Sequence, residues 1–185
     1  MNRTLLTKLH LGFAAFMFPA VLMFLVTGAL YTWGNKGAWH EESASITLSQ
    51  PLAEQSEGDI TSMAVQQLVE RDLPMPSGKL TVSEGEGASL SWIGARSEIS
   101  IEPGDTPLAA NVEVKEASFH RWLVQLHKAK GSTVFKVYAS FLAATLFLLV
   151  ASGIIMGLQV KAMRGLTIGS GVAGLAAFIG FVLMG

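Results

Sequence analysis

The sequence predicts an α-helical membrane protein with three transmembrane helices and one small extracytoplasmic α+β domain. Half of the 185 residues are apolar, and most of these lie in three long blocks. All 14 acidic residues lie between Glu41 and Glu116, and outside that window every charged side chain is basic. Such a split indicates two different environments along one chain.

The first apolar block is residues 11–33, which contain no charged side chain. At about 1.5 Å per residue this helix is about 34 Å long, enough to cross a hydrocarbon core of roughly 30 Å. Pro19 lies inside it, and membrane helices tolerate proline, usually with a kink. A cleaved signal peptide is the alternative, but the block exceeds the usual apolar region and lacks a clear A-x-A site. We therefore expect an uncleaved transmembrane helix.

The second and third predicted membrane helices are residues 134–158 and 166–185. Lys136 is the one charge in the second, at its first turn, where a lysine can reach the headgroups. The third is rich in glycine, and Gly165 and Gly169 have the small-xxx-small spacing that lets helices approach closely. This spacing favours a homo-oligomer or a membrane partner at the third helix, although membrane helices are in general richer in glycine than soluble ones.

The basic residues predict the orientation. Arg3 and Lys8 precede the first helix, Lys161 and Arg164 lie between the second and third, and neither segment contains an acid. The positive-inside rule places both in the cytoplasm. The acidic middle then faces the periplasm or the cell exterior, and the C-terminus lies on that side too.

This orientation predicts a cytoplasmic N-terminus over residues 1–10, a soluble domain over 34–118 and a cytoplasmic loop over 159–165. A contrary signal is the group of lysines on the outer side of the second helix, Lys128, Lys130 and Lys136. The opposite orientation would place both acid-free basic segments outside the cell, so we favour the orientation with a cytoplasmic N-terminus.

The soluble domain is predicted to hold one helix and one small sheet. Apolar spacing predicts a helix from Ile60 to Leu73, with Asp59 as N-cap and Pro74 after its end. Three strand-like segments and a further short strand follow, giving an order of roughly α-β-β-β: residues 79–83, 89–92, 98–101 and 112–114. A domain of this size holds a small core, with one helix packed on one sheet.

Residues 119–133 are predicted to form an amphipathic segment before the second membrane helix. Phe119, Trp122, Leu123 and Leu126 have helical spacing and predict its apolar face. A bend is expected near Gly131.

The four histidines are the residues most suited to carrying chemistry: His10, His40, His120 and His127. All four flank predicted membrane helices. His120 and His127 are seven residues apart and share a helix face, and His40 follows the outer end of the first helix by seven residues. These three can meet at the outer membrane surface, whereas His10 is expected some 30 Å away at the inner end.

Imidazole is a good axial ligand for haem iron, so a b-type haem is the cofactor to test. His40 with His127 could form a bis-histidine site within one chain. His120 with His127 could not clamp one haem, because both point the same way about 10 Å apart. His10 would need Met156, Met163 or a second subunit. Two alternatives stay open: copper or zinc bound by His40, His120 and His127, and hydrogen bonding of each histidine to a carbonyl or a headgroup.

Several classes of site are excluded by the sequence. The chain has no cysteine, which excludes disulfides, thiolate-bound zinc and covalent haem attachment. It has no H-E-x-x-H, G-x-S-x-G, P-loop or G-x-G-x-x-G pattern, and no catalytic residue is predicted. No basic stripe accompanies the aromatic residues, so nucleic acid is not an expected partner. No acid lies within a predicted membrane helix, which argues against an ion-coupled transporter.

Three motifs resemble those of PepSY-associated transmembrane proteins. Leu9-His10 opens the first helix, and residues 24–30 read F-L-V-T-G-A-L, which is similar to the family's L-H start and L-T-G-A-L end. Residues 120–128, H-R-W-L-V-Q-L-H-K, resemble the family's H-R-x-L-x-x-L-H motif. Residues 149–154, L-V-A-S-G-I, resemble its L-x-x-[ST]-G-L. In order and spacing, the resemblance covers most of the chain.

The resemblance implies a multi-pass protein of the bacterial inner membrane with a periplasmic PepSY domain. It carries His10, His120 and His127 over as haem-site positions, whereas His40 matches no motif and rests on geometry alone. Larger relatives in the family have more helices and paired histidines, and some of them bind haem and pass electrons to ferric siderophores. One function that the resemblance implies is therefore b-haem electron transfer linked to iron or siderophore handling. The alternative is a non-catalytic membrane-anchored module whose PepSY domain binds or regulates a periplasmic protein.

Overall fold

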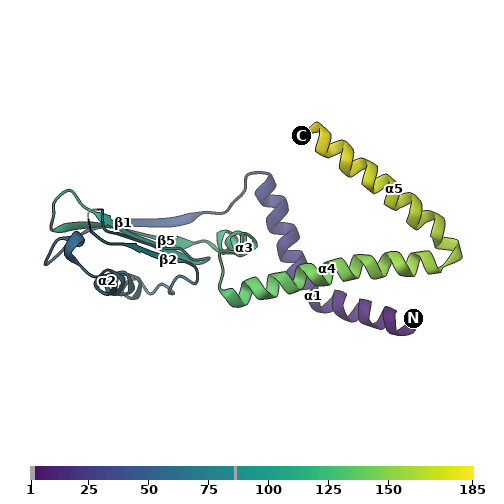
Figure 1. The fold of residues 1–185 in the computed structure, drawn as a ribbon, viewed down its shortest axis with the longest axis horizontal. Coiled ribbons are helices and arrows are strands. Elements are labelled where there is room, and N and C mark those ends of the chain that lie inside the picture. Colours follow the sequence, from purple (N-terminus) through teal and green to yellow (C-terminus); the bar gives the residue numbers. More distant parts are fainter. Residues whose placement is uncertain (1–2, 86) are drawn as a thin grey trace. The chain divides into compact units, whose positions relative to one another are not determined.

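Three helices of the computed structural model are long and apolar enough to cross a membrane, which identifies the chain as a membrane protein. The structure describes residues 3–85 and 87–185, so the first two residues of the predicted N-terminal segment lie outside it. The three helices are α1 (Arg3–Thr32), α4 (Thr133–Gln159) and α5 (Lys161–Met184), shown in Figure 1. The chain divides into two compact units, Met1–Val21 with Ser140–Gly185 and Leu22–Ala139.

The helices are longer than the apolar blocks that predict them. α1 begins at Arg3 instead of residue 11, and α5 begins at Lys161 instead of residue 166. Lys, Arg and Met are good helix formers, so a helix continues past the end of its apolar block. Only Val160 separates α4 from α5, and the predicted loop over residues 159–165 is therefore mostly helical.

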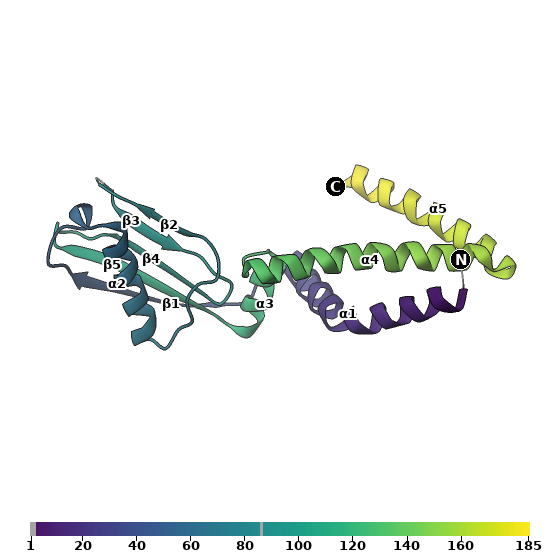
Figure 2. The ribbon, with the colours of Figure 1, turned by 60° about the horizontal axis from the view of Figure 1, so that its bottom comes forward.

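Five antiparallel strands form a single sheet in the order β1-β5-β4-β3-β2. They are β1 (Trp39–Thr47), β2 (Leu80–Ser83), β3 (Ser89–Trp92), β4 (Ser97–Pro103) and β5 (Ala109–Ala117), and Figure 2 shows them edge to edge. The predicted α-β-β-β order lacks β1, which precedes the helix. Six successive side chains of β1, from His40 to Ser45, are exposed, so it has no apolar alternation to mark it as a strand.

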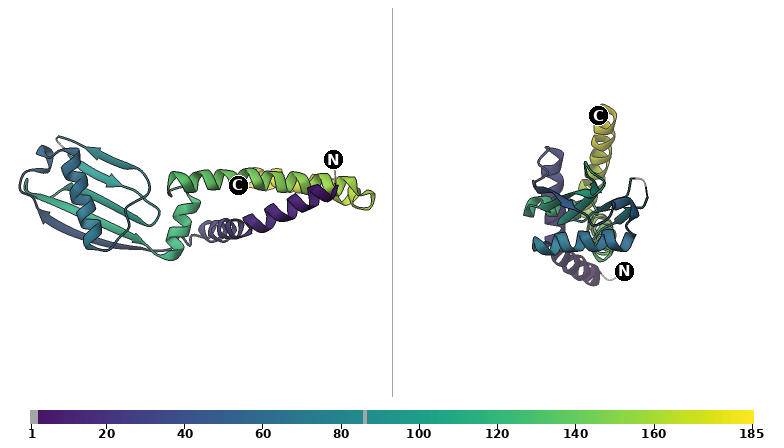
Figure 3. Two further views of the ribbon diagram at one scale, coloured as in Figure 1. Left: turned by 90° about the horizontal axis from the view of Figure 1, so that it is seen from below. Right: turned by 90° about the vertical axis from the view of Figure 1, so that its left-hand side faces the viewer.

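α2 (Glu57–Glu70) covers one face of this sheet, as Figure 3 shows. Its predicted apolar positions Ile60, Ala64 and Leu68 are buried, and they pack on buried side chains of the sheet: Leu90, Ile99, Ile101, Val112 and Val114. The N-cap is Ser56 and not Asp59, because Asp59 occupies the third helical position and closes a capping box with Ser56. A short 3₁₀ helix, η1 (Leu52–Glu54), precedes α2.

The segment before the second membrane helix is a short helix followed by a bend. α3 (Phe119–His127) ends four residues before Gly131, and Ala129 has a left-handed φ of 57°. A Cβ at Gly131 would lie 2.8 Å from Cδ2 of Leu126, so a larger residue at the bend would require this side chain to move. The buried face of α3 is Val124 and Gln125, whereas Phe119 of the predicted apolar face is 71% exposed.

Candidate functional site

The structure places the four histidines on three different elements. His10 lies in α1, His40 in β1, and His120 and His127 in α3. Of these, His10 and His127 hydrogen-bond to a hydroxyl group of a second helix.

His10 has a defined ring orientation. Its Nδ1 lies 2.8 Å from Oγ of Ser152 in α4, and the Ser152 hydroxyl donates to the backbone carbonyl of Leu149 at 3.0 Å. If the single proton of the Ser152 hydroxyl goes to Leu149, Ser152 accepts from His10 and the Nδ1 of His10 carries the ring proton. In the neutral imidazole, Nε2 then has a free lone pair.

An apolar groove of about 350 Å³ borders His10. Leu6, Leu9 and Phe13 of α1 line one side, and Phe141, Leu148 and Ile155 of α4 line the other. Apart from His10, the lining side chains with a polar atom are Thr145 and Ser152. The Cε1 atom of His10 would lie 3.9 Å from a Cβ at Gly153, so the ring stands against the backbone of α4 at a glycine.

His127 repeats this arrangement against α1. Its Nδ1 lies 2.9 Å from Oγ1 of Thr27, whose hydroxyl donates to the backbone carbonyl of Met23 at 2.6 Å. The same proton count assigns the ring proton to Nδ1 and the lone pair to Nε2. The ring packs on Phe24 with centroids 4.8 Å apart, and a Cβ at Gly28 would lie 3.2 Å from its Cε1 atom.

The other two histidines lie in different surroundings. The Nε2 atom of His120 is buried and has no hydrogen-bond partner in the part of the chain that the structure describes. His40 is exposed on β1, opposite Glu116 of β5. Among residues 3–85 and 87–185, no three His, Asp or Glu side chains gather as a metal ion would require. The structure therefore does not gather His40, His120 and His127 into a metal site.

Sequence reasoning singled out the histidines but assigned no role to Thr27 and Ser152. The signal was present in the two resemblance motifs, since a hydroxyl residue precedes a glycine at Thr27-Gly28 and again at Ser152-Gly153. In each pair the hydroxyl contacts the Nδ1 atom of a histidine, and at Gly28 the glycine also leaves room for the ring.

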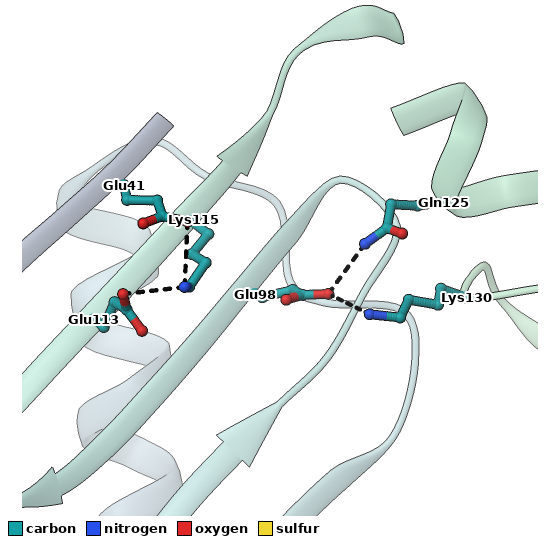
Figure 4. Close-up of polar contacts among 6 residues, drawn as sticks. All are labelled: Glu41, Glu98, Glu113, Lys115, Gln125 and Lys130. Atoms are coloured by element: carbon teal, nitrogen blue, oxygen red, sulfur yellow. Dashed lines mark hydrogen bonds and ion pairs between the residues drawn. The ribbon is translucent and has the colours of Figure 1, made fainter. Parts of the chain in front are cut away.

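Polar contacts hold α3 against the sheet. Glu98 of β4 accepts hydrogen bonds from Gln125 at 3.3 Å and from Lys130 at 3.0 Å (Figure 4). On the same face of the sheet Lys115 lies between Glu41 and Glu113. Its hydrogen bond to Glu113 raises the pKa of Lys115, burial opposes this, and Glu41 adds to the rise. The contacts of Glu98 hold the last turn of α3 and the residues that follow it, and thereby the part of the helix that carries His127.

No protein-family model matches the chain, and neither a curated protein nor a solved structure matches it.

Proposed function

We propose that the chain is a membrane electron-transfer protein of the PepSY-associated type, which binds b-type haem at two separate sites, one through Nε2 of His10 and one through Nε2 of His127. The observation that carries this proposal is the pair of matching hydrogen-bond chains, His10 to Ser152 to Leu149 and His127 to Thr27 to Met23. A metal-binding histidine usually donates its other ring N–H to a neighbour, which fixes the tautomer and the ring orientation. Ser152 and Thr27 would do this for the two histidines.

The number of ligands favours haem over a free metal ion. A protein site for zinc uses at least three side-chain ligands, whereas the porphyrin itself supplies four nitrogen atoms and leaves one or two positions to the protein. A single imidazole in an apolar setting therefore suits haem better than a free zinc ion. Because the groove beside His10 is lined almost entirely by carbon, it also suits the apolar edge of a macrocycle.

The chemistry that haem supplies when bound is reversible one-electron transfer. The chain's own residues orient the ligand atoms and exclude water. Ser152 and Thr27 would accept from Nδ1 of each histidine and leave Nε2 for the iron, and Gly28 lets the backbone of α1 come close to the His127 ring. We place the chain in the bacterial inner membrane on its resemblance to PepSY-associated proteins, and the acidic domain in the periplasm on the distribution of its basic residues.

The test is an absorption spectrum of the detergent-purified protein, oxidised and then reduced with dithionite. If each histidine holds its own haem, His10→Ala and His127→Ala each halve the haem bound per chain, and the double variant binds none. His40→Ala and His120→Ala are the matched controls and should leave haem content unchanged. A spectrum without a Soret band after expression with haem supplied would refute the proposal.

A second candidate, a module that binds a periplasmic protein, is favoured by the edge strand β1. This strand pairs only with β5 among the described residues, and its outer edge can accept a strand of a partner. A photo-reactive residue at Ser43 of β1 should then crosslink to a strand of one defined partner. The control is Ser62, which is exposed on α2, and equal crosslinking there would contradict strand pairing.

A further inference from the structure

A second concave site lies on the soluble domain, where the sheet meets α3. It is a cleft of about 340 Å³, lined by His40 of β1, Glu116 of β5, Arg96 of the loop before β4, and Phe119 and Trp122 of α3. None of the histidines proposed to bind haem borders it.

The charged side chains of this cleft have no partner within the described residues. Arg96 stacks on Trp122, with Cζ 5.8 Å from the ring centroid, and makes no ion pair there. Within the described part of the chain, Glu116 and His40 likewise make neither an ion pair nor a side-chain hydrogen bond. Elsewhere on the sheet Lys115 and Glu98 are paired with opposite charges. Among the described residues, the cleft thus presents an unpaired guanidinium, Arg96, and an unpaired carboxylate, Glu116, each of which can bind a group of opposite charge.

A ligand that satisfies both is a zwitterion with an anionic oxygen group for Arg96 and an ammonium group for Glu116. Guanidinium binds phosphate through two parallel N–H groups, and a carboxylate accepts the N–H donors of a primary ammonium. Phe119, which is 71% exposed, and Trp122 add an aromatic surface beside these charges.

The place of the cleft beside the end of the membrane-spanning helix α1 indicates the source of this zwitterion. Ser118, which borders the cleft, donates its backbone N–H to the carbonyl of Ala38, six residues past the end of α1, and Arg121 donates to the carbonyl of Lys36. The start of α3 therefore lies beside the segment that leaves α1, where the headgroup layer is expected. Tryptophan is enriched in that layer, and Trp33 at the end of α1 is itself 89% exposed.

We propose that this cleft binds the headgroup of a zwitterionic phospholipid with a primary ammonium group, the phosphatidylethanolamine class. The phosphate binds Arg96, the ammonium binds Glu116, and Phe119 and Trp122 contact the glycerol and the upper acyl chains. A choline headgroup binds more weakly, because its quaternary ammonium has no N–H to donate to Glu116.

The test uses the full chain in detergent micelles loaded with equal amounts of phosphatidylethanolamine, phosphatidylcholine and phosphatidylglycerol, with bound lipid counted by native mass spectrometry. We expect phosphatidylethanolamine to be retained about tenfold over phosphatidylcholine, the effect of roughly one charged hydrogen bond. Glu116→Gln should remove this preference, and Arg96→Gln should reduce retention of both zwitterionic lipids. Glu113→Gln, on the same strand but the opposite face of the sheet, is the matched control and should change nothing.

Equal retention of the three lipids, or an unchanged preference in Glu116→Gln, would overturn the proposal. Free phenylalanine is added in a separate arm. If it displaces phosphatidylethanolamine in a manner that depends on Arg96 and Glu116, the ligand is a soluble zwitterion and the lipid assignment is wrong. His10→Ala with His127→Ala should retain the lipid, which separates this site from the proposed haem sites.

Discussion

Replacing Thr27 by valine removes the hydroxyl that accepts from His127 and keeps the shape of the side chain. Thr27 is 2% exposed, and its Oγ1 atom lies 2.9 Å from Nδ1 of His127. The variant leaves the ring N–H without its acceptor. Loss of one such bond typically costs about 1 kcal/mol in a soluble protein and about 0.6 kcal/mol between membrane helices. We therefore expect Thr27→Val to lower the free energy of unfolding by about 0.5–1.5 kcal/mol.

The same change bears on the proposed haem site. If Thr27 orients His127 as a ligand, its loss should weaken haem binding by about 10–100-fold, the usual effect of removing a partner of a metal-binding histidine. Thr32→Val is the matched control. Its hydroxyl also donates to a backbone carbonyl of α1, at Gly28, but touches no histidine.

Two measurements check this prediction: thermal unfolding of the purified protein in detergent by circular dichroism, and titration with haem by absorption at the Soret band. A double-mutant cycle with His127→Ala isolates the contact, since Thr27→Val should have no further effect once the imidazole is absent. Equal effects of Thr27→Val in the presence and absence of His127 would refute the reasoning. So would equal effects of Thr27→Val and Thr32→Val.

Three further predictions follow from the fold. Ile60→Ala removes a fully buried side chain between α2 and the sheet and should lower the free energy of unfolding by about 2–5 kcal/mol, measured by denaturant titration. Lys115→Gln should cost less than about 1 kcal/mol at neutral pH, because surface ion pairs such as those with Glu113 and Glu41 contribute little. Since folding raises the pKa of Lys115 above 10.5, its contribution is present below that pH and is lost as the pH rises through the raised pKa, where variant and wild type should converge. A phosphatase fused after Gly185 should be active if the C-terminus lies outside the cytoplasm, and a correctly inserted but inactive fusion would reverse the orientation.

The sequence predicts the three membrane helices because their signal is local and long. A block of some 20 apolar residues has few alternatives in a folded chain. The helix α2 is predicted for a related reason, since Ile60, Ala64 and Leu68 recur on one face and all three are buried. In both cases the elements are defined by neighbouring residues.

The features that sequence reasoning missed depend on contacts between distant residues. β1 pairs with β5, which lies at the other end of the domain in sequence. Because the side chains of β1 are mostly exposed, β1 lacks the apolar alternation by which a strand is predicted. Thr27 and His127 are 100 positions apart, and His10 and Ser152 are 142 apart. The hydroxyl–glycine pairs at Thr27-Gly28 and Ser152-Gly153 were the one local signal, and they do not say which distant residue the hydroxyl contacts.

α3 connects the proposed lipid cleft on the soluble domain with the proposed haem site at His127. Its first residues, Phe119 and Trp122, line the cleft on the soluble domain, and its last residue, His127, bonds to Thr27 of α1. Glu98 holds the helix to the sheet through Gln125 and Lys130. A helix of nine residues is too short to bend independently at its two ends, so a ligand that moves Phe119 or Trp122 also moves His127. Phosphatidylethanolamine in the cleft should therefore shift the Soret band of haem at His127, and Glu98→Gln should weaken that shift.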